Sequence, residues 1–344
     1  MGVDLSGIVS SKTIEFKNLP RGVVAVDAYN ALYQFLSVIR QPDGSPLTNS
    51  KGETTSHLQG LFYRTINLLE VGVRPVYVFD GAVHELKHRE LETREERRER
   101  AEKEARVAVS EGRLEVARSK AAQAVRMNKP MAEQAKTLLA HMGVPSVQAP
   151  FEGEAQAAKI ALDGKAYACA SQDYDSLLFG APKLLRNLTI AGRRKLPFRN
   201  SYTEVKPELV ELYEVLRSNG ISREQLVEIA LLVGTDYNPE GFPGIGAKTA
   251  LKLIREHGNI RAALAAKGFS PSFDVDRLKS EFLNPRVSDD YSFAFTSPDR
   301  EAVLRFLCDE NDFSHERVEA ALQRLSNAAS SSSGSQQSLE KWFG

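Results

Sequence analysis

The segment Phe151-Glu152-Gly153-Glu154-Ala155 places two glutamates two residues apart, directly before the helical pattern of residues 155–160. Residues i and i+2 of a helix point to different faces, so this pair can share a ligand only in an extended segment or a turn. Gly153 between them permits an unusual backbone. Several carboxylates in one place repel each other, so either their pKa values rise or cations lie among them. The segment therefore predicts a site built from acidic side chains.

Apolar runs that end in acids recur along the chain. They alternate with helical patterns, at about 29–39 and 56–71, which predicts an α/β fold: a mostly parallel twisted central sheet with helices on both faces. Sites in such sheets form outside the carboxyl ends of the strands. Four strand-like runs (21–26, 75–79, 147–150 and 166–171) therefore bring one set of acids to the same edge: Asp27, Asp80, Glu152, Glu154, Asp173 and Asp175.

Composition narrows the class of protein only a little. With 344 residues and 42% hydrophobic content, the chain can bury a substantial core in one large domain or two modest ones. Its two cysteines are far apart in no metal-like spacing, which suits a reducing cell interior. No apolar run reaches the length of a membrane span, and the N-terminus lacks a secretion signal. A net charge of zero does not by itself support a nucleic-acid partner, although it can hide a polarised surface.

Two short motifs at the start and in the middle of the chain offer competing interpretations. Met1-Gly2-Val3-Asp4-Leu5-Ser6 matches the loose N-myristoylation pattern, but no polybasic stretch lies beside it. His84-Glu85-Leu86-Lys87-His88 matches the H-E-x-x-H pattern of zinc metalloproteases. The glutamate-rich segment that follows offers no distinctive third ligand, and it reads as a charged surface helix. A zinc protease is therefore an alternative that the surrounding sequence does not favour.

Residues 84–109 alternate basic and acidic side chains with little apolar face, which predicts a helix laced with i,i+4 ion pairs. Gly112 ends it before an Ala-rich second helix, and Pro130 opens another helix in its first turn. A long polar excursion between two strands of one sheet is an insertion that projects from the core. We place this insertion at about residues 82–128.

A glycine-rich hairpin follows the helix that Ser222 and Gln225 open with a capping box. The stretch 241–250 lacks the adjacent Gly-Lys of a P-loop, and Gly244-Ile245-Gly246 between two helices is typical of a helix-hairpin-helix element, at about 222–260. Glycines there let backbone amides approach a phosphate, and Lys248 adds charge at a helix start. An ordinary glycine-rich turn is the alternative.

The C-terminal composition changes at residue 328. Residues 328–335 are Ala, Ser and Gly, which predicts a flexible linker, and residues 336–344 form an aromatic tail that includes the single Trp. Such an apolar cluster after a linker indicates docking into a partner pocket, with docking back on its own domain as the alternative. Residues 1–327 then form one domain.

These motifs together resemble the flap endonucleases of the structure-specific 5′-nuclease superfamily, in their archaeal and eukaryotic form. The resemblance spans nearly the whole chain and rests on four motifs in order and spacing: Val78-Phe79-Asp80-Gly81, Glu152-Gly153-Glu154-Ala155, Gln172-Asp173-Tyr174-Asp175 and Gly234-Thr235-Asp236-Tyr237. It implies a Mg²⁺-dependent endonuclease that removes 5′ flaps at single-strand/duplex junctions, with a 5′-exonuclease side activity, in Okazaki-fragment maturation and base-excision repair.

The resemblance also implies residue roles. It implies two bound Mg²⁺ ions, for which Mn²⁺ can substitute. Their expected ligands are Asp27, Asp80, Glu152, Glu154, Asp173, Asp175 and Asp236. Oxygen ligands suit such hard cations. Asp80, Glu152 and Asp173 are also taken as catalytic, together with Lys87 and Arg94, a basic pair seven residues apart at the base of a helical arch. The other arginines of that segment stay solvated in this interpretation.

DNA contacts and partners follow from the same resemblance. Tyr33 is expected to stack on a base and Gly2 to lie close to the DNA. A K⁺ ion is expected at the hairpin. A region that grips the upstream duplex and its short 3′ flap is matched by Thr54, Thr55 and Arg64, and one that binds the backbone of the downstream duplex by Gly244, Gly246 and Lys248. Arg40 and Gly234 are further expected DNA contacts. A sliding-clamp peptide is assigned to Gln336, Leu339, Trp342 and Phe343.

One departure from the family is the end of the chain directly after this peptide, without the long basic tail of eukaryotic members. This favours an archaeal protein and leaves nuclear targeting without support. A cytoplasmic location and a monomeric state are further expectations. The alternatives within the superfamily are a 5′-exonuclease or a bubble-cutting repair nuclease. From a different class, the alternative is a non-catalytic, clamp-bound DNA-junction protein.

Overall fold

The computed structural model describes residues 2–41, 44–190, 192–195 and 202–340. Its strands are β1 (Lys12–Thr13), β2 (Gly22–Asp27), β3 (Val73–Phe79), β4 (Ser146–Gln148), β5 (Ala168–Ala170), β6 (Lys183–Arg186), β7 (Gly192–Lys195), β8 (Tyr202–Val205) and β9 (Glu208–Glu211). Its α-helices are α1 (Ala28–Val38), α2 (Ser56–Glu70), α3 (His88–Ser110), α4 (Leu114–Gln123), α5 (Lys129–His141), α6 (Gly153–Leu162), α7 (Asp175–Leu178), α8 (Leu212–Asn219), α9 (Arg223–Val233), α10 (Ala247–His257), α11 (Ile260–Ala266), α12 (Val275–Leu283), α13 (Arg300–Leu304) and α14 (His315–Glu340). Short 3₁₀ turns form η1 (Phe16–Asn18) and η2 (Glu85–Lys87), and a π-helical turn forms η3 (Arg305–Asp309).

Seven strands form the central sheet, in the order β1-β9-β6-β5-β2-β3-β4. The pairs β6–β5, β5–β2, β2–β3 and β3–β4 are parallel, whereas β9 runs antiparallel to both β6 and β1. The predicted mostly parallel sheet is therefore confirmed, with an antiparallel edge that the sequence patterns did not indicate. Strands β7 and β8 form a separate antiparallel hairpin.

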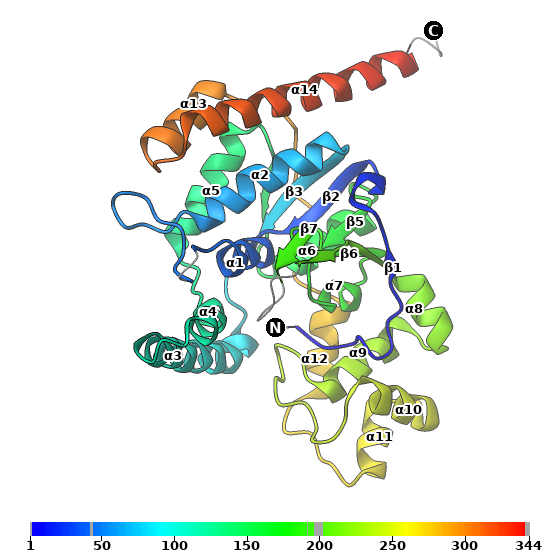
Figure 1. Ribbon diagram of the computed structural model, residues 1–344. Helices are drawn as coiled ribbons and strands as arrows, with labels where there is room; N and C mark the ends of the chain where they lie inside the picture. The colour runs from blue at the N-terminus through cyan, green and yellow to red at the C-terminus, as the bar shows by residue number, and fades with distance from the viewer. Residues whose placement is uncertain (1, 42–43, 191, 196–201, 341–344) are drawn as a thin grey trace.

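The sheet is buried on both faces because its strands carry apolar side chains at successive positions. Val24 and Val26 of β2 pack with α1, α2, α5 and α14, whereas Ala25 packs with α6, α7 and α9. Figure 1 shows these two helical layers on opposite sides of the sheet. Because side chains alternate along a strand, one apolar strand serves two cores, which is the pattern of a buried parallel sheet.

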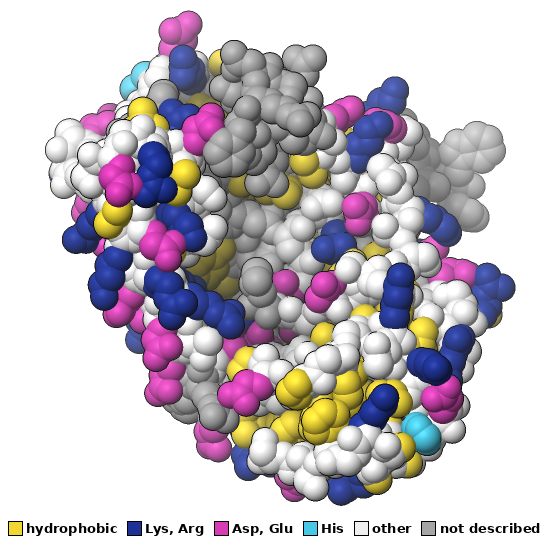
Figure 2. Space-filling model, turned by 60° about the horizontal axis from the view of Figure 1, so that its bottom comes forward, with side chains coloured by type: hydrophobic (Ala, Val, Ile, Leu, Met, Phe, Trp, Pro, Cys, Tyr) yellow, Lys and Arg dark blue, Asp and Glu magenta, His cyan; other side chains and the backbone are white. Residues whose placement is uncertain are grey.

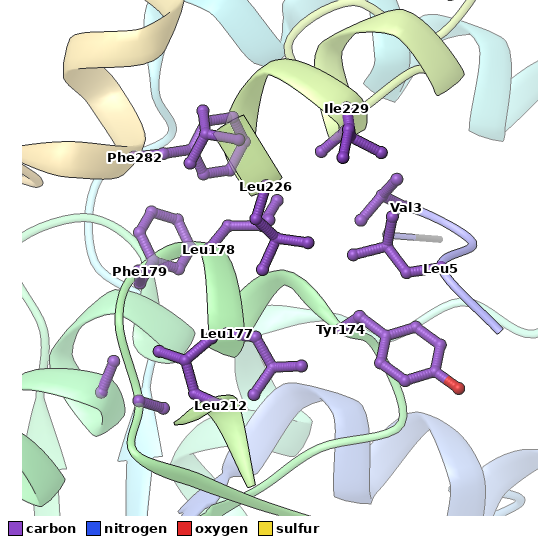
Figure 3. Packing of buried hydrophobic residues seen from close by; sticks show 14 of the residues in the cluster. Val3, Leu5, Tyr174, Leu177, Leu178, Phe179, Leu212, Leu226, Ile229 and Phe282 are labelled. Atoms are coloured by element: carbon purple, nitrogen blue, oxygen red, sulfur yellow. The ribbon is translucent and has the colours of Figure 1, made fainter. Parts of the chain in front are cut away.

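The N-terminal segment is buried in the core that Ala25 forms with α6, α7 and α9. Val3 and Leu5 are buried and lie beside Leu226 and Ile229 of α9 in Figure 3. The backbone N–H of Val3 also donates to Asp175 Oδ1 at 3.0 Å. This anchoring brings the start of the chain to the carboxyl ends of the strands, beside the acids.

The charged insertion forms a helical pair, as predicted. Helix α3 ends at Ser110, Gly112 adopts φ +72°, and α4 packs back against α3. Asn128 caps α5, whose first turn contains the predicted proline. Figure 1 shows α3 and α4 to one side of the sheet. Lys120 of α4 pairs with Glu104 of α3 at 2.5 Å, so ion pairs link the two helices as well as the turns within α3.

The backbone of residues 328–335 is helical, as part of α14, whereas its composition predicts a linker. The segment contains no proline, and its two alanines favour continuation of the preceding helix. The aromatic end of the tail, Trp342 and Phe343, lies outside the described residues. Among the described residues, no helix is both long and apolar enough to span a membrane.

Helices α1 and α2 pack closely because α2 carries a glycine at their contact. A Cβ atom added to Gly60 would lie 2.2 Å from Phe35 Cγ. We expect Gly60→Ala to lower the free energy of unfolding by roughly 1–3 kcal/mol through overpacking. Urea unfolding measures this loss. Phe35→Ala should relieve the clash, so the double variant should lose less than the sum of the two single losses. An additive loss would contradict this account of the contact.

Candidate functional site

Four neighbouring parallel strands end at the acidic residues. Asp27 is the last residue of β2 and Asp80 follows β3 directly, while Glu152 and Asp173 follow β4 and β5 within four residues. These strands are adjacent in the order β5-β2-β3-β4. The predicted convergence at one edge of the sheet therefore has its topological basis in the structure.

The β4–α6 connection sets Glu152 and Glu154 in place. Glu152 precedes α6 as its N-cap residue, and Glu154 lies in the first turn. Gly153 N–H donates to Asp80 Oδ1 at 2.7 Å, and a Cβ atom on Gly153 would lie 2.7 Å from that same oxygen. The glycine is therefore needed for this close approach rather than for an unusual φ, which was the reason that the sequence suggested.

The second acidic pair is fixed from two directions. Asn30 Nδ2 donates to Asp173 Oδ2 at 3.3 Å, and Asn30 N–H donates to Asp27 Oδ1 at 3.0 Å, so one residue of α1 binds two of the acids. Asp175 is buried at the start of α7. A Cβ atom on Gly2 would lie 2.8 Å from Asp173 Cβ and 2.8 Å from Asp175 Oδ1. Gly2, expected near DNA, thus lies against this pair.

Asp236 joins the cluster from outside the sheet, after α9. Gly234 ends that helix with φ +114°, a backbone conformation that residues other than glycine rarely adopt. Arg94 Nη2 lies 2.8 Å from both carboxylate oxygens of Asp236, and Lys87 Nζ lies 3.2 Å from Oδ2. The seventh predicted acid is therefore bound by the two predicted bases.

Lys87 connects the base of the insertion to the strand ends. Its Nζ donates to Glu152 Oε2 at 2.5 Å and lies 5.5 Å from the centroid of the Tyr237 ring. Figure 2 shows a hollow on this face of the molecule, with acidic side chains in and beside it and Lys and Arg side chains along one rim. The contacts of Lys87 thus bring opposite charges together at the strand ends.

Burial and mutual repulsion raise the pKa of several acids. Burial, with the nearby Glu152 charge, raises the pKa of Asp80 to about 6. Burial and the neighbouring Asp236 raise the pKa of Asp175 to about 7. Burial also lifts the pKa values of Asp27 and Glu154 well above their usual range.

The two bases reverse this trend at Asp236. Burial alone would raise its pKa, but Lys87 and Arg94 outweigh that effect and hold the pKa of Asp236 below its usual value. Burial would lower the pKa of Lys87, yet Glu152 and Asp236 raise it well above its usual range. Lys87 therefore stays charged among the acids.

The donor set suits a hard divalent cation, since the acids supply only oxygen atoms and their raised pKa values reflect charge that a cation would relieve. Within the described part of the chain, no three His, Cys, Asp or Glu side chains already surround one point as ligands do. Lys87 and Arg94 occupy carboxylate oxygens of Glu152 and Asp236 instead. The residues fit a metal site in which some acids exchange these partners for cations.

The other predicted contact residues lie in separate places. Tyr33 pairs with the arch, because Arg98 Nη2 donates to its hydroxyl at 3.0 Å and the guanidinium lies 5.3 Å from its ring centroid. The sequence interpretation left Arg98 solvated. Its spacing of four from Arg94 placed both on one helix face, which is the signal that could have identified it. Arg40 donates to the carbonyl of Gly44 at 2.8 Å.

The other residues predicted to bind the upstream duplex line two cavities or lie beside one of them. Thr55 lines a cavity of about 540 Å³ together with residues of the 311–317 segment and of α14. Thr54 is next to it, in a bridge with Thr48. Arg64 lines a different cavity of about 320 Å³, where it lies 5.5 Å from the Phe16 ring centroid.

The glycine-rich hairpin has the expected open geometry. Gly244 adopts φ +75°, and a Cβ atom on Gly244 or Gly246 would meet nothing within 4 Å. Gly246 is the N-cap residue of α10 and provides no side-chain cap, while Lys248 is exposed in the first turn. The first amides of α10 are therefore open to an anion.

The zinc-protease alternative does not fit the local structure. His84 precedes the 3₁₀ turn Glu85–Lys87, and α3 begins only at His88, so the two histidines do not share one turn of an α-helix. The ring of His84 is also buried against Glu281, with Nε2 3.1 Å from Oε2. The H-E-x-x-H match is therefore coincidental.

Comparisons with known proteins agree with this site. Residues 2–101 match the XPG N-terminal domain family, and residues 143–236 match the XPG I-region family. Flap endonuclease 1 of Pyrococcus furiosus is 55% identical over 345 residues, which cover 100% of this chain and 99% of that protein. The chain belongs to the flap endonuclease family. The family resemblance inferred from the motifs is therefore confirmed, and members of this family are metal-dependent nucleases.

Other archaeal relatives and solved structures extend the match. Flap endonuclease 1 of Methanosarcina acetivorans is 49% identical over 343 residues, and the match covers 100% of each chain. The solved flap endonuclease-1 from Methanococcus jannaschii is 40% identical, with a TM-score of 0.76, over 96% of this chain and 100% of that one. The catalytic core of Rad2 in complex with DNA substrate, 24% identical over 92% of this chain and 96% of its own, has the same fold with a TM-score of 0.69.

The raised pKa of Asp175 makes stability depend on pH. Its folded value of about 7, against an ordinary 3.8, means that its cost to folding is absent below about pH 4 and complete above about pH 7. We expect Asp175→Asn to stabilise the metal-free protein at pH 8 by roughly 1–3 kcal/mol, with little effect at pH 4. The amide oxygen can still accept the N–H of Val3. Urea unfolding in EDTA at both pH values measures the effect, and an equal change at both would contradict it.

Proposed function

We propose that this chain is a structure-specific endonuclease that hydrolyses one DNA phosphodiester where a 5′ single-stranded flap meets a duplex, leaving a 5′-phosphate and a 3′-hydroxyl. The observation that carries the proposal is the gathering of acids at four adjacent strand ends, with Lys87 and Arg94 reaching them from the insertion. Membership of the flap endonuclease family supports it. The cellular roles that follow are Okazaki-fragment maturation and base-excision repair.

The seven predicted acids would hold two Mg²⁺ ions, with Mn²⁺ as a substitute. Such a pair, when bound, supplies an activated water and stabilises the leaving oxygen of an in-line displacement. The protein contributes the rigid placement of the carboxylates through Gly153 N–H, Val3 N–H and Asn30. Asp80, Glu152 and Asp173, which follow three of the four strands, would act as the catalytic subset.

Lys87 and Arg94 would form ion pairs with the scissile phosphate. Each is bound to carboxylates in the structure, with Lys87 on Glu152 and Arg94 on Asp236. A phosphate that enters the hollow presents oxygens of the same kind, so these bases can exchange partners without losing their charge pairing. Their positive charge then stabilises the negative charge that develops during displacement.

The DNA would cross the face that carries the hollow. Tyr33 stacks on a base beside the cleavage point, and Gly2 lets the chain pass close to the strand. The cavity at Thr55 receives the short 3′ flap of the upstream duplex. Gly244, Gly246 and Lys248 bind a phosphate of the downstream duplex with a K⁺ ion nearby, because open helix amides attract anions.

The decisive experiment is single-turnover cleavage of an end-labelled double-flap DNA with Mg²⁺, beside an equal-sequence single strand and a blunt duplex. We expect one product at the junction or one nucleotide inside it, lost in EDTA. Asp173→Ala combined with Asp175→Ala should abolish cleavage and leave DNA binding largely intact. Tight junction binding without cutting by the unmodified chain would replace the proposal with a non-catalytic junction protein, and a ladder from the duplex end with an exonuclease.

The C-terminal peptide is proposed to bind a sliding clamp through Gln336, Leu339, Trp342 and Phe343. Deletion of residues 336–344 should leave cleavage by the free enzyme unchanged, because the predicted active-site residues all precede α14. The same deletion should remove any stimulation by the clamp. A matched variant with Trp342→Ala and Phe343→Ala should behave like the deletion. Stimulation that survives both changes would show that the clamp contacts another surface.

A further inference from the structure

His84 is a buried histidine that the proposed chemistry does not use. It is 2% exposed and lies at the start of the insertion, next to the short turn η2. Its Nδ1 accepts the backbone N–H of Leu86 at 3.2 Å. Its Nε2 lies 3.1 Å from Oε2 of the Glu281 carboxylate. The guanidinium of Arg286 lies against the same edge of the ring.

The rings around His84 connect it to both acids that bind Lys87. The His84 centroid lies 5.3 Å from that of Tyr237 and 5.9 Å from that of Phe151, both in edge-to-face arrangements. Tyr237 follows Asp236 in the chain, and Phe151 precedes Glu152. His84 therefore packs against the residues next to two carboxylates of the site.

Helix α12 provides the fixed side of this arrangement. Glu281 belongs to α12, and the ring of the adjacent Phe282 packs against Tyr237 at 5.1 Å. Phe282 is buried in the same core as α9, beside Phe179 in Figure 3. The guanidinium of Arg286, just beyond α12, covers the ring of Phe151 at 4.1 Å. His84 thus joins the base of the insertion to a packed part of the protein.

The contacts of His84 lead directly to Lys87. The carbonyl of His84 accepts Lys87 N–H at 3.0 Å, so its main chain starts the turn η2 and its side chain caps that turn at Leu86. Lys87 then extends over the ring of Tyr237, which His84 supports from another side. Both the backbone and the side chain of Lys87 therefore depend on groups that His84 contacts.

We propose that His84 is a positioning residue that holds Lys87 toward Glu152 and Asp236. The proposal rests on the proposed function, because it concerns the same site. His84→Ala removes the cap on η2 and the contact with Glu281, so Lys87 loses its fixed position. We expect the single-turnover cleavage rate to fall by roughly 10- to 100-fold. Affinity for the double-flap DNA should change less than about twofold, since Lys87 contributes one contact among many.

A double-mutant cycle separates positioning from a general loss of structure. If His84 acts through Lys87, adding His84→Ala to Lys87→Ala should slow cleavage no further. An equal loss in both backgrounds would overturn the proposal. His84→Asn keeps an acceptor for Leu86 N–H and should recover most of the rate. His84→Gln places its amide N–H near Glu281 instead and should recover less, since the cap on η2 fixes the Lys87 backbone. Full loss in the Asn variant would overturn this assignment.

His57 offers a matched control. It is also a fully buried histidine, but it belongs to α2 and, among the described residues, its Nε2 pairs with Gln134 Oε1 at 3.1 Å rather than with one of the acids. His57→Ala should lower stability while leaving the single-turnover rate unchanged at a temperature where the variant is folded. A rate loss equal to that of His84→Ala would make the effect non-specific and overturn the proposal.

A readout without catalysis keeps the two proposals distinguishable. Lys87 is held at Glu152, so it should react slowly with an N-hydroxysuccinimide acetylating reagent. His84→Ala should accelerate acetylation of Lys87, measured by peptide mass spectrometry, with Lys252 as an exposed internal reference. If the unmodified chain cuts no DNA but this acceleration occurs, the proposed function fails and the positioning role stands. Unchanged acetylation in the variant overturns the positioning role alone.

Discussion

Repulsion among buried carboxylates is the constraint on which the rest of this structure depends. Parallel strands deliver acids to one edge of the sheet, where burial makes each charge costly and the neighbouring charges add to the cost. The backbone N–H groups of Val3 and Gly153 and the side chain of Asn30 compensate part of it. The anchored N-terminus, the glycine at the start of α6 and the capping of α1 are three local features with this one purpose.

The remaining charge is compensated from the insertion, and this links the two parts of the molecule energetically. Lys87 and Arg94 bind the acids in geometry that leaves both signs of charge paired. A buried ion pair contributes little net stability, because desolvation offsets most of the attraction. Replacing such a pair by a cation on the acid and a phosphate on the base therefore costs little. The arrangement is stable without DNA and is still ready to exchange partners.

The sequence predicted what is local and missed what is long-range. The ends of β2, β3, β4 and β5 were recognisable because apolar runs and the acids after them are contiguous in the chain, and the parallel sheet follows from their alternation with helices. The antiparallel strands β6 and β9 are short and carry charged ends, so no periodicity marked them. The contact of His84 with Glu281 joins residues 197 positions apart and has no local signature. The contact of Arg98 with Tyr33 spans 65 positions, and only the helix face that Arg98 shares with Arg94 could be recognised locally.

The net charge of zero gives no indication of nucleic-acid binding, because it reports only the sum of the charges and not where they lie. The charges that cancel in the total are not spread evenly, because several acids meet at the strand ends, where Lys87 and Arg94 bind two of them. A cation bound among the acids would leave the rim bases as the dominant field toward a DNA backbone. Screening limits such fields to about 10 Å at ordinary ionic strength, so the local arrangement decides binding and the total does not. In the proposed chemistry the site needs both kinds of charge: acids alone would repel the phosphate, and bases alone would hold it without chemistry.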